Sequence, residues 1–199
     1  MKCITHAGKK GRLPLAVFLA AIIGGSVTLM PEPQKPQEDV HAYAEAEVPE
    51  PKTYEPKFIE YDVPDGRTSF KSYMGFKSIT NKRSEQYRLQ EDCWTDADGL
   101  RRYEDDYVVA LGTFYADHIG ERFRITLDTG ESFYAVIGDF KADRDTDENN
   151  QYTPTARCGK CVLEFVVDTK KLDRTARKMG DISYISGFCG NVEMIEKVK

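Results

Sequence analysis

The chain has few histidines and no excess of positive charge, and each shortage excludes a class of function. It holds three histidines in 199 residues, and only His118 lies beyond residue 67. A histidine-dependent nucleophilic triad or a multi-histidine metal site therefore lacks its residues there. The formal net charge is −5, so the chain lacks the basic footprint of a nucleic-acid-binding protein. We expect no nucleic-acid partner.

The charges fall into three blocks. Residues 1–30 carry four basic residues and no acid, and residues 31–66 carry ten acids and three lysines. Residues 67–199 are close to balance, with 21 basic and 23 acidic residues. This third block is predicted to be the folded domain, because its 133 residues are enough for one packed core. The strand pattern described below favours a β-barrel for residues 67–199.

Residues 13–30 contain no charged residue. Eighteen helical residues span about 27 Å, close to the hydrocarbon thickness of a bilayer. Basic residues precede this segment and acidic residues follow it, which places residues 1–12 in the cytoplasm and the C-terminal domain outside. We therefore predict a single-pass protein of the cell membrane with a transmembrane signal-anchor at 13–30. A cleaved signal peptide, which would give a secreted protein, is the alternative.

Seven of the nine prolines lie between residues 31 and 64, among glutamate, glutamine, lysine and alanine. Such a segment has too few large apolar residues to offset the entropy of ordering the chain. Residues 31–66 are therefore predicted to be a disordered linker, with a reach on the order of 100 Å if fully extended.

From about residue 70 the pattern is typical of a mainly β fold. Apolar and polar residues alternate in 122–127, and a second strand is expected at 132–137 after the turn Asp128-Thr129-Gly130. Helical spacing of Leu172, Ala176 and Met179 predicts one short helix at 170–179. Six or more short strands with one helix favour a small barrel. The expected strands are 107–112, 122–127, 132–137, 161–167, 181–185 and 192–198.

The triplet Asp128-Thr129-Gly130 also matches the catalytic triplet of aspartic proteases. That chemistry needs two aspartates that share a proton, and the sequence contains one such triplet. The same residues are good turn formers, so we interpret them as a hairpin turn.

Asp143, Asp145 and Asp147 have the spacing of a calcium loop. An EF-hand loop requires glycine at its sixth position and glutamate at its twelfth, where this chain has Glu148 and Pro154. The EF-hand pattern therefore fails, and a solvated acidic loop or a looser cation site remains.

Four cysteines lie outside the predicted membrane segment and beyond the linker: Cys93, Cys158, Cys161 and Cys189. They could form up to two disulfides, a four-cysteine zinc site, or remain free thiols. Cys158 and Cys161 form a CxxC pair, but they lead into a predicted strand rather than a helix, which disfavours a redox role.

With histidine so scarce, acid–base chemistry would depend on carboxylates. Asp139 follows an apolar strand, and Glu164 lies within the apolar run 162–166. Side chains alternate in direction along a strand, so Glu164 either faces solvent or points into a cleft.

Four segments together resemble double-psi β-barrel proteins, nearest to the three-aspartate and RlpA-like domains: 107–112, 119–125, 134–139 and 163–168. The resemblance implies a six-stranded double-psi barrel that acts on peptidoglycan, as a lytic transglycosylase does, with no bound cofactor. Asp139 matches the aspartate after the central strand, and Glu164 falls where a second aspartate opens the next strand. The resembling domains have a third aspartate near the position of Leu111. They also have a Gly-Gly pair after the central aspartate, where this chain has Phe140-Lys141-Ala142.

Two hypotheses follow. In the first, the domain cleaves wall glycan with Asp139 as the acid and Glu164 as its helper. In the second, it binds wall glycan or an envelope protein without catalysis. Asp143, Asp145 and Tyr134 are the predicted binding residues.

Overall fold

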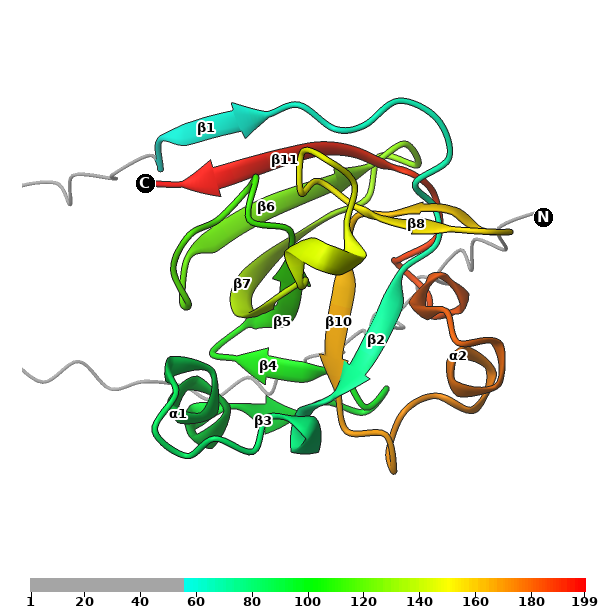
Figure 1. Cartoon of the computed structure of the whole chain (residues 1–199). Helices are drawn as coiled ribbons and strands as arrows, with labels where there is room; N and C mark the ends of the chain where they lie inside the picture. Colours follow the sequence, from blue (N-terminus) through cyan, green and yellow to red (C-terminus); the bar gives the residue numbers. More distant parts are fainter. Residues whose placement is uncertain (1–55) are drawn as a thin grey trace, which may run out of the picture. The chain divides into compact units, whose positions relative to one another are not determined.

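Strands dominate the described part of the chain, residues 56–199, in the computed structural model (Figure 1). The fold is mainly β with two short α-helices in this range, which confirms the predicted class. The predicted cytoplasmic and membrane segments, and the linker as far as residue 55, lie outside the described residues. No helix within residues 56–199 has the length and apolar character needed to cross a bilayer.

The strands are β1 (Phe58–Tyr61), β2 (Ser72–Gly75), β3 (Trp94–Thr95), β4 (Arg101–Tyr103), β5 (Asp106–Leu111), β6 (Arg122–Leu127), β7 (Ser132–Phe140), β8 (Thr153–Thr155), β9 (Gly159–Cys161), β10 (Glu164–Val167) and β11 (Val192–Val198). The helices are α1 (Glu85–Asp92) and α2 (Arg174–Met179), and three 3-10 turns are η1 (Phe76–Ser78), η2 (Asp143–Asp145) and η3 (Ile182–Tyr184).

Nine of these strands form one sheet with the order β1-β11-β6-β7-β5-β10-β2, to which β3 and β4 are added beside β5. The pairs β5–β7 and β10–β2 are parallel, and the other pairs in the sheet are antiparallel. The strands β8 and β9 form a separate hairpin. Figure 1 shows β5, β7 and β10 near the middle of the domain.

The two faces of the central strands pack against different clusters. Val109 and Leu111 of β5 belong to the large core, whereas Val108 joins a small cluster with Val136 and Val166. This alternation is the expected consequence of the two-residue period of a strand. Four rings in the large core meet with centroids 4.9–6.0 Å apart, those of Tyr107, Phe133, Phe165 and Phe188.

The chain just before β2 contacts the start of β11. The Thr68 backbone N–H donates to the Asn191 side chain at 2.9 Å, and the Thr68 hydroxyl donates to the Val192 carbonyl at 3.1 Å. Asn191 also donates from its backbone and its side chain to Asp128, at 2.9 and 2.7 Å. Without β1, the strand order is a path of six strands from β11 to β2. These bonds bring the β2 and β11 ends of this six-strand path together, and we call this region the seam.

Several sequence predictions are confirmed. Strands lie at 106–111, 122–127, 132–140 and 192–198, and the pair β6–β7 is the expected antiparallel hairpin. Its turn includes Gly130 at φ 84°, a conformation that favours glycine. Asp128 lies in this turn and is an acceptor for Asn191, as expected of a structural residue rather than a protease aspartate.

Other predictions are wrong in detail. The segment 181–185 is not a strand but contains η3, because the Asp181 side chain accepts the Ser183 backbone N–H and favours a turn. The run 161–167 is divided between the end of β9 and β10, and the helix expected at 170–179 begins only at Arg174. The strand β1 lies inside the predicted linker, where it pairs with β11. The folded part therefore begins before residue 67.

Candidate functional site

The two acids selected from the sequence lie on strands that flank the same residue. Glu164 of β10 and Asp139 of β7 are both in register with Ala110 of β5, which lies between them in the sheet. Residues in register on neighbouring strands point to the same face. Two strand spacings separate the Cα atoms of the acids by about 10 Å. The small side chain of Ala110 lies between the two acids and is fully buried under its neighbours.

A bulge in β7 gives Asp139 this position. Val109 pairs with Ile137 but Ala110 pairs with Asp139, so Gly138 is an extra residue on β7. A Cβ at Gly138 would lie 2.2 Å from Val108 Cγ1, closer than any packing allows. Glycine at 138 therefore permits the close approach of the two strands, and the bulge turns Asp139 to the face that Ala110 occupies.

Burial raises the pKa of Asp139 above its usual value, and the nearby charge of Glu164 adds to this effect. Hydrogen bonds from the Phe140 backbone N–H and the Gln86 side chain favour the charged form and oppose the shift. Gln86 belongs to α1, so this helix covers one side of the carboxylate. An aspartate with a raised pKa keeps its proton to a higher pH, which is the property a general acid needs.

Glu164 lies at the wall of a pocket of about 570 Å³. Its carboxylate accepts a hydrogen bond of 3.1 Å from Ser72, its register partner on β2. Ser72 also lines the pocket, whereas Asp139 does not. We call this the lysine pocket, and it is lined by Phe70, Ser72, Lys141, Ala142, Asp145, Thr153, Thr155, Cys161 and Glu164.

Lys141 is the one lysine among these lining residues, and only 5% of its surface is exposed. Its backbone N–H donates to Leu111, so the main chain after β7 continues beside β5. Its ammonium lies 3.4 Å from the Thr153 hydroxyl and 3.6 Å from the Cys161 sulfur. The Cys161 thiol in turn lies 3.2 Å from the Ser72 hydroxyl. The sequence reasoning missed Lys141, Ser72 and Cys161 as a group because they come from three separate strands or strand ends.

The predicted binding residues are not brought together. Asp145 lines the lysine pocket, but Asp143 points elsewhere and accepts a hydrogen bond from the Thr113 hydroxyl at 2.9 Å. Tyr134 lies near the other end of β7, in register with Arg124, and the Arg122 guanidinium lies 4.2 Å from its ring centroid. Of the three residues, Asp145 alone lies beside Glu164.

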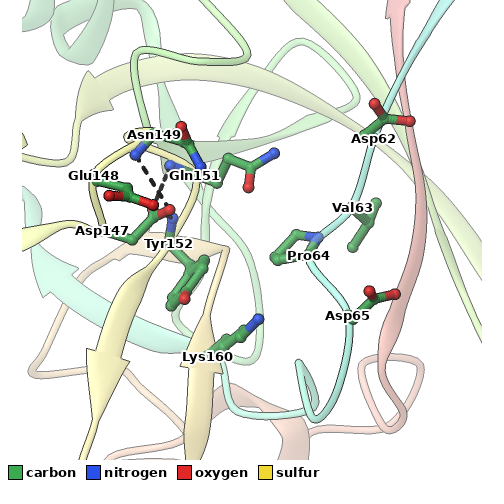
Figure 2. Close-up of a pocket in the computed structure, with 10 residues that line it drawn as sticks. All are labelled: Asp62, Val63, Pro64, Asp65, Asp147, Glu148, Asn149, Gln151, Tyr152 and Lys160. Carbon is green, nitrogen blue, oxygen red and sulfur yellow. Dashed lines mark hydrogen bonds between the residues drawn. The ribbon is translucent and has the colours of Figure 1, made fainter.

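The acidic loop is organised by its own side chain. Asp147 accepts backbone N–H groups of Asn149, Gln151 and Tyr152, as Figure 2 shows. Partial burial raises the pKa of Asp147, but these hydrogen bonds outweigh it and hold the pKa below its usual value. Its oxygens are therefore already used as acceptors. A second pocket beside this loop is bordered by the chain after β1, where Asp62 and Asp65 lie.

Three of the four candidate cysteines, Cys93, Cys158 and Cys161, are free thiols, which is one of the alternatives that the sequence left open. Within residues 56–199 no three cysteines lie close enough together to hold a metal ion, so the four-cysteine zinc site does not form there. Burial raises the pKa of Cys93 to about 11, and its thiol donates to the Leu89 carbonyl at 3.0 Å. A thiol with so high a pKa is a poor nucleophile.

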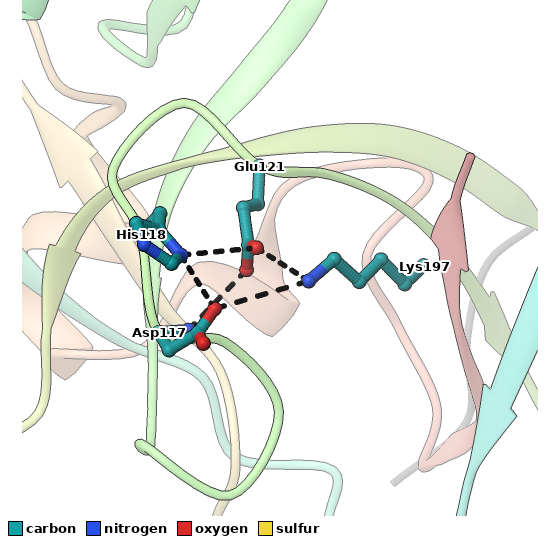
Figure 3. Close-up of polar contacts among 4 residues, drawn as sticks. All are labelled: Asp117, His118, Glu121 and Lys197. Atoms are coloured by element: carbon teal, nitrogen blue, oxygen red, sulfur yellow. Dashed lines mark hydrogen bonds and ion pairs between the residues drawn. The ribbon is translucent and has the colours of Figure 1, made fainter.

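One group of three metal-ligand side chains occurs within residues 56–199, formed by Asp117, His118 and Glu121 (Figure 3). The His118 Nδ1–H donates to the Asp117 carboxylate at 2.7 Å, and this hydrogen bond raises the pKa of the imidazole. The Lys197 ammonium pairs with Glu121 and lies 4.0 Å from Asp117. A lysine therefore already supplies the positive charge that a cation would bring, and Asp117 and His118 are exposed. We interpret the group as a surface ion-pair network.

Comparison with known proteins finds no matching family model, no matching curated protein and no matching solved structure.

Proposed function

We propose that the domain is a double-psi β-barrel held outside the cytoplasm, and that its outer face acts on peptidoglycan glycan. The six-strand path from β11 to β2 supports the barrel, because its two ends meet at the seam and it contains two parallel pairs. The uncharged segment 13–30 supports export from the cytoplasm, either as a membrane anchor or as a cleaved signal.

The observation that carries the proposal is the position of the two acids on either side of Ala110. Asp139 is partly buried with a raised pKa, and in its protonated form it can donate to a glycosidic oxygen. Glu164, held by Ser72, can stabilise the positive charge that develops at the neighbouring sugar carbon as that bond breaks. The C6 hydroxyl of the same sugar then bonds to this carbon and gives its proton to the Asp139 carboxylate, which restores the acid and leaves an anhydro end. Asp139 is thus the acid, Glu164 is the helper, and no cofactor takes part.

A second candidate function is glycan or protein binding without cleavage. It is favoured by Gln86, which hydrogen-bonds Asp139, and by the pocket, which exposes Glu164 but not Asp139. Leu111, near the position of a third aspartate in the resembling domains, is fully buried in the large core and cannot take a catalytic role.

Incubation of the full chain with purified peptidoglycan separates the two functions. The enzyme predicts soluble anhydro-muropeptides, detected by mass spectrometry, that disappear in Asp139→Asn and fall in Glu164→Gln. The matched control is Asp105→Asn in the exposed turn between β4 and β5, which should release products at the wild-type rate. Sedimentation with the wall and no release supports the binding module. A chain that neither sediments nor releases product neither cleaves nor binds wall glycan, which leaves a protein partner.

The pH profile of product release tests the role of Asp139. The protonated acid is the active form, and its raised pKa keeps that form present at pH values where an ordinary aspartate, with a pKa of about 3.9, is ionised. Release should therefore decline as pH rises through the raised pKa. Release that increases over the same range contradicts an acid role for Asp139.

A further inference from the structure

The lysine pocket contains a buried positive charge with poor partners. Among residues 56–199, no carboxylate oxygen lies within 4.0 Å of the Lys141 ammonium. Its two contacts, a hydroxyl at 3.4 Å and a thiol at 3.6 Å, are both neutral. The first is longer than the usual N–H···O length of about 2.9 Å, and a thiol sulfur is a weak acceptor.

An ammonium group has three N–H donors and a large desolvation cost when it is buried. Proteins normally offset that cost with a carboxylate or with several short hydrogen bonds. Lys141 has neither, yet it lines a pocket large enough for a small ligand. An anionic group that entered the pocket would supply the missing acceptor.

The pocket also carries negative charge at a separate place. Glu164 presents a carboxylate that Ser72 orients at 3.1 Å. Asp145 lies on the η2 turn with 62% of its side chain exposed, and its carboxylate lies 3.8 Å from the guanidinium of the exposed Arg144. A purely anionic ligand would be repelled by these two acids. A ligand with one carboxylate and one ammonium group would be complementary to both regions of the pocket.

We infer that the lysine pocket binds the zwitterionic end of a peptide, with the ligand carboxylate on Lys141 and its ammonium group between Glu164 and Asp145. This inference rests on the proposed function, because a protein that acts on the wall meets the short free peptides that wall breakdown releases, and these carry both an ammonium group and a carboxylate. It adds that the domain recognises such a free peptide as well as the glycan.

Calorimetric titration of the full chain with D-alanyl-D-alanine tests the pocket. The dipeptide should bind, its C-terminal amide should bind at least tenfold more weakly, and its N-acetyl derivative should also bind more weakly. Equal binding of inorganic phosphate would mean that the pocket is a simple anion site and would overturn the inference. Absence of dipeptide binding at millimolar concentration would overturn it as well.

Three variants locate the binding. Lys141→Met should lower the affinity for the dipeptide at least tenfold, and Asp145→Asn should lower it by a smaller factor without affecting the fold, because Asp145 is exposed. The matched control is Lys160→Met, on β9 beside Cys161 but outside the lysine pocket, which should leave the affinity unchanged. Unchanged affinity in both pocket variants rules out this site.

The outcome is separable from that of the proposed function. A chain that sediments with peptidoglycan or releases muropeptides, but does not bind the dipeptide, retains the proposed function and contradicts only the peptide site. A chain that binds the dipeptide through Lys141 and ignores intact wall supports the pocket and contradicts glycan cleavage.

Discussion

Lys71 and Lys141 are both buried lysines near Cys161, but their ammonium groups have different surroundings. Lys71 lies at the seam, where it donates to the Gly190 carbonyl at 2.7 Å and to the Ser69 carbonyl at 3.1 Å. Lys141 lies at the lysine pocket with only a distant hydroxyl and a thiol. The first lysine is satisfied by the protein itself, and the second lacks strong acceptors.

The difference shows that burial of a charge does not by itself indicate function. At the seam, backbone carbonyls receive the ammonium, and Asp128 and Asp181 act on it electrostatically. Lys71 therefore contributes to joining two ends of the sheet. In the pocket, the missing acceptors leave room for a ligand. We expect substitutions at the seam to change stability and substitutions in the pocket to change binding.

The largest predicted effect is a pH dependence of stability caused by Lys71. Burial lowers its pKa from 10.5 to about 8, although Asp181 and Asp128 oppose the shift. Between pH 8 and pH 10.5 the unfolded chain binds more protons than the folded chain, so wild-type stability rises with pH in this window. The shift corresponds to about 3 kcal/mol in total.

Lys71→Met removes this titration, so the comparison of the two proteins isolates it from other groups. Urea denaturation measures the free energy of unfolding of both proteins at pH 7 and pH 10. The difference, wild type minus variant, should rise by most of about 3 kcal/mol between the two pH values. A constant difference between the two proteins would show that the Lys71 ammonium is not desolvated in the folded state.

A second prediction concerns Asp128 at the seam. Asp128→Ala removes the acceptor of two hydrogen bonds from Asn191, and it removes a charge that favours the Lys71 ammonium. Hydrogen bonds to charged groups are worth about 1.5–3 kcal/mol, so we expect a loss of about 2 kcal/mol in the free energy of unfolding. Asp128→Asn keeps an acceptor oxygen and should lose less. Equal losses would show that the charge alone matters.

The strands with alternating or continuous apolar residues could be predicted from the sequence, whereas the helix α1 could not. Alternation in 122–127 and the apolar runs at 107–112 and 132–137 identify β6, β5 and β7, because these strands bury one or both faces. The helix α1 has the sequence EQYRLQED, with a single buried residue, and gives almost no apolar signal. Ser84 is the one residue of this segment whose type is typical of a helix start, and in the structure its side chain accepts the Tyr87 backbone N–H.

The site was predictable only in part. Asp139 and Glu164 were found because they interrupt apolar strands, and they lie on the same face through a bulge at Gly138 that the sequence does not reveal. Ser72 and Lys141 were missed because their positions depend on strand pairing between distant segments. The parallel pair β10–β2 joins residues about ninety positions apart, and no local pattern reports such a register.

A third prediction concerns Ser72, which orients Glu164 at the pocket wall. Ser72→Ala removes a partly buried hydrogen bond to Glu164 and a weak one from the Cys161 thiol, so we expect a loss of about 1 kcal/mol in the free energy of unfolding. Ser78→Ala, which removes an exposed local hydrogen bond to Gly75, is a control that should lose less. Thermal or urea denaturation measures both. A loss as large as that of Asp128→Ala would mean that the pocket wall is as structural as the seam.

The smallest expected effect on stability is that of Lys141→Met. Methionine fills a similar volume, and it removes a buried charge whose two contacts are long and neutral, so the desolvation cost and the lost contacts nearly cancel. We expect the free energy of unfolding at pH 7 to change by less than about 1 kcal/mol. A loss above that of Ser72→Ala in urea denaturation would show that Lys141 is a structural residue like Lys71. A small change together with loss of dipeptide binding is the combination that only a ligand-binding lysine produces, since a structural lysine would lower stability as well.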